Sequence, residues 1–78
     1  MAIRYTTHLE QRLVERCITR EQIEAVLEAP EGYHDDPDQR SVRLWGTISG
    51  RVLKVWVVAP WPSGATVVVK SAAWKGDG

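Results

Sequence analysis

Three side chains that can exchange a proton or hold an anion recur at every fourth position near the start of the chain: His8, Arg12 and Arg16. On a helix this spacing places them in one row along a face. An imidazole transfers protons near neutral pH, and guanidinium groups stabilise negative charge on a phosphate. We therefore predict them as the catalytic residues if the chain cleaves RNA by 2′-hydroxyl attack, with His34 as a second candidate for proton transfer. The alternative is that the row is a solvated helix face.

A second group of residues interleaves cations with indoles in the C-terminal half. Residues 41–48 and 52–59 alternate apolar and polar positions, and the Ser49-Gly50 pair between them is typical of a two-residue hairpin turn. The register set by this turn pairs Ile48 with Arg51, Leu44 with Val55, Val42 with Val57, Trp45 with Lys54 and Arg43 with Trp56. One face of the hairpin is therefore aliphatic, and the other carries the cations and the indoles.

The third predicted strand, residues 66–74, extends this second face. If residues 60–64 form the connecting loop, Val69 lies opposite Val55 and Lys70 lies opposite Lys54. The predicted binding residues on this face are Arg43, Trp45, Lys54, Trp56 and Lys70, with Trp74 as a further member. Cations between exposed indoles suit single-stranded RNA, because phosphates take the charges and bases stack on the rings. Two alternatives stay open: a face for a protein partner or for self-association, and plain cation–π pairing that stabilises the sheet.

Two helices are marked by their start and stop signals. Thr7 and Glu10 fit a capping box that opens the first helix, and Thr19 and Gln22 repeat the pattern for the second. Apolar residues recur at helical spacing in both segments. Pro30 disfavours helical geometry in the residue before it, so the second helix is expected to end just ahead of it.

These elements predict an α+β fold: two N-terminal helices packed on one face of a three- to four-stranded antiparallel sheet. The helices are expected on the aliphatic side of the hairpin, because no other element is available to cover it. Ala2–Tyr5 is expected to be an extended lead-in. Residues 31–40 are expected to be an acidic loop, with room for a short edge strand at Tyr33–His34.

The pattern His8-x-x-x-Arg12-x-x-x-Arg16-x-Ile18, followed by a capped acidic helix that ends in Ala29-Pro30, resembles a small bacterial family catalogued as domain of unknown function four-two-five-eight. The resemblance is close over about the first thirty residues and looser over the strands. It implies a RelE-like fold, shared with the RelE-like and BrnT-like toxins, which are small ribonucleases with helices on one side of an antiparallel sheet. The family pattern usually has Gly in place of Cys17. A left-handed helix end there would cost a cysteine about 1 kcal/mol.

Length and composition limit the number of domains, the cellular location and the kinds of ligand that this chain is expected to have. The 78 residues predict a single domain, 1–78, with residues 75–78 as a frayed tail. Ten basic and ten acidic residues leave no net charge, which disfavours a nucleic-acid binder unless the charges are distributed unevenly. One cysteine excludes an internal disulfide and fits a cytoplasmic location. The sequence contains no apolar run of membrane-spanning length, and His34-Asp35-Asp36 matches no zinc pattern, so we expect no membrane association, metal or cofactor.

Two hypotheses for function follow. The first is an RNA-binding protein or a toxin-like, metal-free endoribonuclease, whose partner is RNA. The second is a non-enzymatic interaction module that uses the face of cations and indoles to bind an antitoxin-like protein or to form a homodimer. A third hypothesis is a purely structural domain whose rows of polar residues are only solvated.

Overall fold

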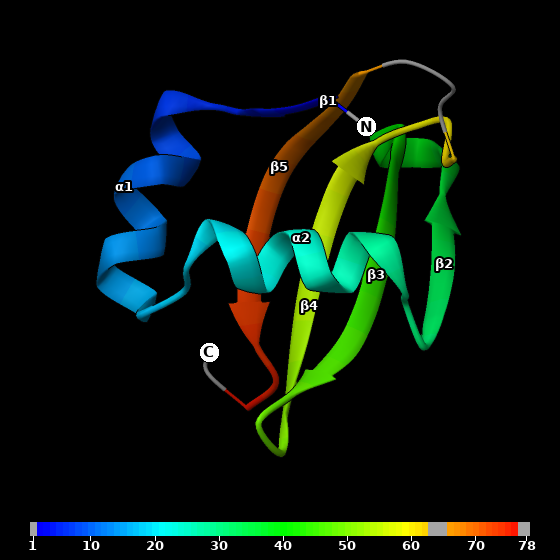
Figure 1. Ribbon diagram of the computed structural model, residues 1–78. Coiled ribbons are helices and arrows are strands. Elements are labelled where there is room, and N and C mark those ends of the chain that lie inside the picture. The colour runs from blue at the N-terminus through cyan, green and yellow to red at the C-terminus, as the bar shows by residue number, and fades with distance from the viewer. Residues whose placement is uncertain (1, 63–65, 77–78) are drawn as a thin grey trace.

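The computed structural model describes residues 2–62 and 66–76 (Figure 1). Its elements in chain order are β1 (Ala2–Tyr5), α1 (Thr7–Arg16), α2 (Arg20–Glu28), β2 (Gly32–Asp36), the short 3-10 helix η1 (Pro37–Gln39), β3 (Ser41–Ile48), β4 (Arg51–Val58) and β5 (Thr66–Trp74). In this described part, neither helix has the length and apolar character needed to cross a lipid bilayer. The class is α+β, as predicted.

The sheet differs from the prediction in size and in direction. It has five strands in the order β1-β5-β4-β3-β2, and β1 runs parallel to β5 while the other pairs are antiparallel. The predicted three- to four-stranded antiparallel sheet is therefore wrong. The lead-in segment forms a strand because Ile3 and Tyr5 pair with Val67 and Val69 and pack against the core.

The segment expected to be an acidic loop is mostly regular. Gly32–Asp36 forms β2, an edge strand that pairs with β3 over its full length, so the short edge strand allowed at Tyr33–His34 is present and longer. Its carboxylates are compatible with a strand because four of its five residues are exposed. The Asp36 side chain then caps η1 by accepting from the Gln39 amide at 3.4 Å.

The helix caps lie at or next to the predicted positions. The α1 cap is Thr6, whose hydroxyl accepts from the Leu9 amide at 3.1 Å, so the predicted cap at Thr7 is one residue too late. Thr6, rather than Thr7, is the cap because its extended backbone lets its hydroxyl reach the Leu9 amide. The capping box of α2, Thr19 with Gln22, is confirmed.

The α1 helix ends in a left-handed residue that is not glycine. Cys17 has φ 56° and ψ 46°, the region that costs a side chain steric strain. The Cys17 amide donates to the Val14 carbonyl and the Ile18 amide to the Leu13 carbonyl, at 3.3 and 3.0 Å. These two bonds form a Schellman motif, and the buried pair Leu13 and Ile18 supplies its apolar contact.

The register predicted between β3 and β4 is confirmed, and the register predicted between β4 and β5 is wrong. All five predicted pairs between β3 and β4 are present, from Ile48 with Arg51 to Val42 with Val57. In β5, however, Val69 pairs with Val57, and Lys54 pairs with Ala73 rather than with Lys70.

The physical reason is a β-bulge at Lys70. Val57 pairs with Val69 and the next residue back, Trp56, pairs with Ser71, so Lys70 is the extra residue. Strict alternation would have turned Ala72 and Trp74 away from the helices. The bulge shifts the phase, and both are buried with the core cluster. Trp74 is therefore not a member of the predicted binding face.

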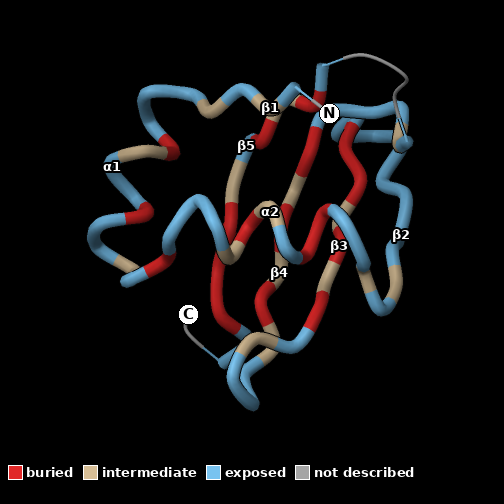
Figure 2. Tube along the Cα trace, in the orientation of Figure 1, coloured by how far each residue is buried: buried red, intermediate tan, exposed pale blue. Residues whose placement is uncertain are grey.

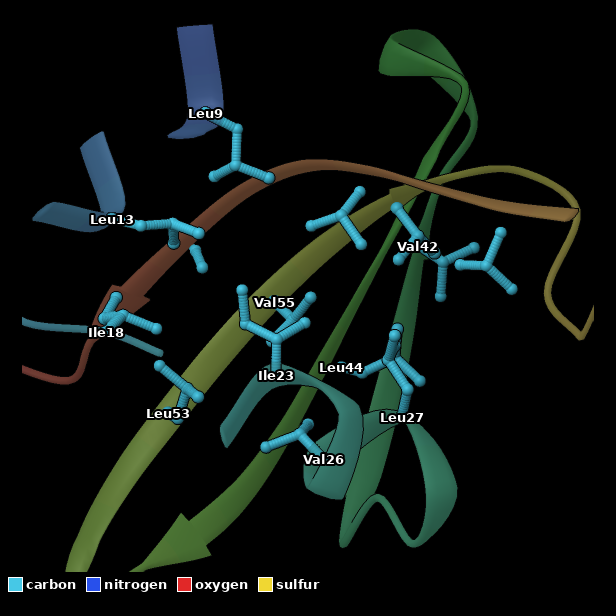
Figure 3. Packing of buried hydrophobic residues seen from close by; sticks show 14 of the residues in the cluster. Leu9, Leu13, Ile18, Ile23, Val26, Leu27, Val42, Leu44, Leu53 and Val55 are labelled. Carbon is cyan, nitrogen blue, oxygen red and sulfur yellow. The ribbon is translucent and has the colours of Figure 1, made fainter. Parts of the chain in front are cut away.

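One hydrophobic core lies between the helices and the sheet (Figures 2 and 3). In Figure 3, Leu9, Leu13 and Ile18 of the α1 region and Ile23, Val26 and Leu27 of α2 point toward the side chains of the central strands. In Figure 1, α2 crosses in front of β5, β4 and β3, and α1 lies outside the β5 edge. Lys75 and Gly76 form a turn after β5, with the Lys75 amide bonded to the Val52 carbonyl at 2.8 Å, and residues 77–78 of the predicted tail lie outside the described residues.

Candidate nucleic-acid interface

The face of the sheet that points away from the helix core, called the open face below, carries a two-by-two block of cations and indoles. Arg43 lies directly opposite Trp56, and Trp45 lies directly opposite Lys54. All four side chains are half-buried, so each keeps surface that a ligand can touch. Residues directly opposite one another on antiparallel strands have Cβ atoms about 5 Å apart, so the block is contiguous.

Each cation of the block also forms a cation–π contact with an indole of its own strand. The Arg43 guanidinium carbon lies 5.6 Å from the centre of the Trp45 ring, and the Lys54 Nζ lies 5.8 Å from the centre of the Trp56 ring. Such contacts hold the cations over the rings and keep them on the open face. The Nε of Arg43 is buried and has no hydrogen-bond partner among the described residues, so part of its donor capacity is unused.

Trp45 is positioned by a glycine on the edge strand. Gly32 pairs with Trp45, and a Cβ at Gly32 would lie only 2.4 Å from the Cζ2 atom of the indole. The ring therefore lies over the backbone of β2, where another residue would have a side chain. This close approach explains a glycine inside a strand.

Two shallow hollows flank the block. The first is about 290 Å³ in volume and is lined by Arg43, Trp45, Val52, Lys54 and Lys75. The second is about 430 Å³, and its lining includes Arg16, Asp36, Gln39, Trp56, Lys70 and Ser71. Each hollow thus has one indole and at least two cations, and the second also contains a carboxylate. Both are open depressions rather than enclosed cavities.

Arg16 reaches the second hollow around the edge of the sheet. The strand β1 ends at Tyr5, which pairs with Val69, so β1 does not accompany the rest of β5. The Arg16 Nη1 donates to the Ala72 carbonyl at 2.7 Å in this later part of β5, and the Trp74 Nε1 donates to the Arg16 carbonyl at 3.0 Å. Arg16 therefore ties α1 to β5 and also lines the hollow.

The other two members of the predicted catalytic row stay away from the open face. His8 and Arg12 are exposed on α1, and Arg12 forms an ion pair with Glu15 at 3.7 Å. The helix turns its buried residues, Leu9 and Leu13, into the core on the opposite side of the sheet. Of the three residues in the row, Arg16 lines a hollow of the open face, whereas His8 and Arg12 line neither hollow.

The structure places His34 beside the block, a position that the sequence did not indicate. His34 pairs with Arg43, so its side chain lies on the open face. The same pairing puts Tyr33 and Asp35 on the helix side, opposite Leu44 and Val42. Because the hairpin register follows from the sequence, only the pairing of β2 with β3 was needed to find this placement.

Charge is distributed unevenly over this neutral chain. On the open face and its rims lie Arg4, by its pairing with Val68, and Arg16, Arg43, Lys54, Lys70 and Lys75. Lys70 also donates to the Gln39 carbonyl at 3.2 Å. Five of the acidic residues lie on the two helices: Glu10, Glu15, Glu21, Glu24 and Glu28. The same helices also carry Arg12 and Arg20, and Asp36 lines the second hollow, so the two signs of charge are only partly segregated.

Comparison with known proteins gives one match. A family model described as Domain of unknown function (DUF4258) matches residues 5–72 of this chain. The matched region runs from the end of β1 through most of β5, so it includes both helices and the whole block. No curated protein and no solved structure matches.

Proposed function

We propose that this chain, which belongs to the DUF4258 family, binds single-stranded RNA on the open face of its sheet. The observation that carries the proposal is the block in which Arg43 faces Trp56 and Trp45 faces Lys54. Bases stack on exposed indoles without regard to sequence, and the neighbouring cations bind phosphates. Duplex RNA fits less well, because its bases are already stacked on one another and only an unpaired strand can present them to the rings.

The charge distribution and the geometry support the same ligand. The cations lie around the two hollows, beside the indoles, where a sugar–phosphate chain would run next to stacked bases. The helices that cover the other face hold five carboxylates and three arginines, so that face favours a polyanion less than the open face does. The proposal also includes a likeness to the RelE-like and BrnT-like ribonuclease toxins. The resemblance over the helices and the position of both helices before the long strands support that likeness.

Tryptophan fluorescence with a mixed-sequence, single-stranded RNA tests the proposal. We expect quenching at low salt, from Trp45 and Trp56. If about three phosphates are neutralised, affinity should fall roughly 20-fold between 50 and 200 mM salt. Trp45→Ala should weaken binding by about 1–3 kcal/mol, the usual contribution of one stacked base. Absence of quenching at low salt would rule the proposal out.

A charge-matched control separates the open face from general attraction. Lys54→Gln and Arg12→Gln each remove one positive charge, the first from the block and the second from the exposed surface of α1. We expect Lys54→Gln to weaken RNA binding at least about fivefold and Arg12→Gln to change it less than about twofold. Equal losses would mean that net charge, rather than the open face, governs binding.

The second candidate function is a protein interface, for an antitoxin-like partner or for a second copy. The two indoles of the block favour it, because tryptophans are enriched at the centres of protein interfaces. Sedimentation distinguishes the two functions. A dimer that is insensitive to salt and is lost in Trp45→Ala would support self-association through the open face. A monomer that binds RNA with steep salt dependence would support the RNA site.

A further inference from the structure

We propose that the open face also cleaves the RNA it binds, and that His34, not His8, accepts the proton of the attacking 2′-hydroxyl. This inference rests on the proposed function, because the substrate must first lie across the block. It changes the order of the two candidates for proton transfer, because the sequence favoured His8 in the row on α1 and named His34 second. The reason for the change is the pairing of β2 with β3, which the sequence did not establish.

A row of side chains crosses the sheet from its edge. His34 on β2 pairs with Arg43 on β3, and Arg43 pairs with Trp56 on β4. All three point to the open face, and neighbouring strands are about 4.8 Å apart. A proton acceptor, a cation and a stacking surface therefore follow one another at steps of about 5 Å.

This order matches what cleavage by a 2′-hydroxyl requires. In the proposed complex a base stacks on Trp56 and the following phosphate lies over β3, within reach of the Arg43 guanidinium that pairs with this indole. The 2′-hydroxyl is the neighbour of that phosphate on the same sugar, and the proposed complex directs it toward the edge strand. His34 is the neighbouring side chain on that side, and it is exposed, so its ring can approach the hydroxyl.

The chemistry balances without any co-reactant. The imidazole of His34 takes the proton from the 2′-hydroxyl as the oxygen forms a bond to phosphorus. The bond from phosphorus to the 5′-oxygen breaks, and that oxygen takes a proton from solvent. The products are a 2′,3′-cyclic phosphate and a free 5′-hydroxyl, and His34 returns its proton to solvent. Arg43 stabilises the charge on the phosphate oxygens while the bonds exchange.

His8 is in the wrong place for the same task. It lies in the first turn of α1, one residue before Leu9, which is buried in the core. That core occupies the other side of the sheet from the block. His8 therefore lies away from an RNA bound across the block, whereas His34 lies beside it.

The test uses two matched variants, His34→Gln and His8→Gln, on exposed positions where neither should affect folding. End-labelled single-stranded RNA is incubated with each protein in the presence of a chelator, and binding is followed separately by tryptophan quenching. We expect His34→Gln to cleave at least about 100-fold more slowly than the natural protein, the usual contribution of a general base. Its RNA affinity should change by less than about threefold, because an exposed side chain at the edge of the block adds little to binding that rests on the cations and indoles. His8→Gln should cleave at the native rate.

A substrate control needs no variant at all. An RNA with one 2′-deoxy sugar at the cleavage position should bind with unchanged affinity and stay intact at that position. Three results would overturn the inference while leaving the binding proposal in place: RNA that binds and is never cleaved, native cleavage by His34→Gln, or cleavage at the deoxy position. Failure of the RNA to bind would instead remove the proposed function and this inference together.

Discussion

The two faces of the sheet are built from alternate residues of the same strands, and they differ in how completely they are covered. On the helix side, Val42, Leu44, Val55 and Val57 keep at most 1% of their surface exposed. On the open face, the residues between them are half-buried. The first face has no surface left for a ligand, and the second has indoles and cations with unused contact area. Stability and binding should therefore respond to different substitutions, even at neighbouring positions.

The largest expected effect is at the covered face. Leu44→Ala removes a fully buried side chain at the centre of the core and should lower the free energy of unfolding by about 2–5 kcal/mol. Lys70→Ala, on the open face, is exposed and should change it by less than about 0.5 kcal/mol. Denaturant titration followed by circular dichroism measures both. Similar losses in the free energy of unfolding for the two variants would mean that both faces contribute equally to stability.

A second comparison uses one glycine from each face. A Cβ at Gly32 would lie 2.4 Å from the Trp45 indole, whereas a Cβ at Gly46 would lie 3.4 Å from the nearest atom of Val26. We expect Gly32→Ala to displace the indole, to cost about 1–3 kcal/mol as an overpacked site, and to shift tryptophan emission. Gly46→Ala should lower the free energy of unfolding by less, because the Val26 side chain has to move only slightly to make room. The reverse order of losses would show that Trp45 is not held over β2.

A smaller gain is expected at the left-handed end of α1. Cys17→Gly relieves a φ of 56° and should stabilise the protein by about 1 kcal/mol, less the entropy that glycine adds to the unfolded chain. Cys17→Ala is the control, because it removes the thiol and keeps the strain. The gain should appear in the thermal midpoint of the glycine variant only. Equal midpoints for both variants would contradict the strain at this position.

The smallest effect concerns a partly buried phenol on the covered side. Burial raises the pKa of Tyr5 above its ordinary value of 10.0, and the charge of Glu24 raises it further. The neutral phenol is thus favoured in the folded state, so its contribution to stability is full below pH 10.0 and is lost as the pH rises through the higher folded pKa. Tyr5→Phe should therefore flatten the alkaline loss of stability, measured as the thermal midpoint against pH. An alkaline loss of stability that is as steep in Tyr5→Phe as in the natural protein would contradict this assignment.

The sequence by itself determined the local features of this protein. The α2 capping box, the stop before Pro30, the hairpin turn at Ser49-Gly50 and the pairing of β3 with β4 all follow from neighbouring residues. The four members of the block could therefore be predicted from the sequence, because a two-residue turn fixes the register of the strands on both sides of it. The cap of α1 differs from the prediction by one residue, since two adjacent threonines present the same hydroxyl.

Only the tertiary structure decided the relations between distant segments. The parallel pairing of β1 with β5, the pairing of β2 with β3 and the bulge at Lys70 depend on which backbone edges and apolar surfaces are left over after the hairpin and helices pack. They brought His34 to the open face and buried Trp74. Local pattern carries no information about such pairings, because an edge strand satisfies its backbone with whichever neighbour the packed core places beside it.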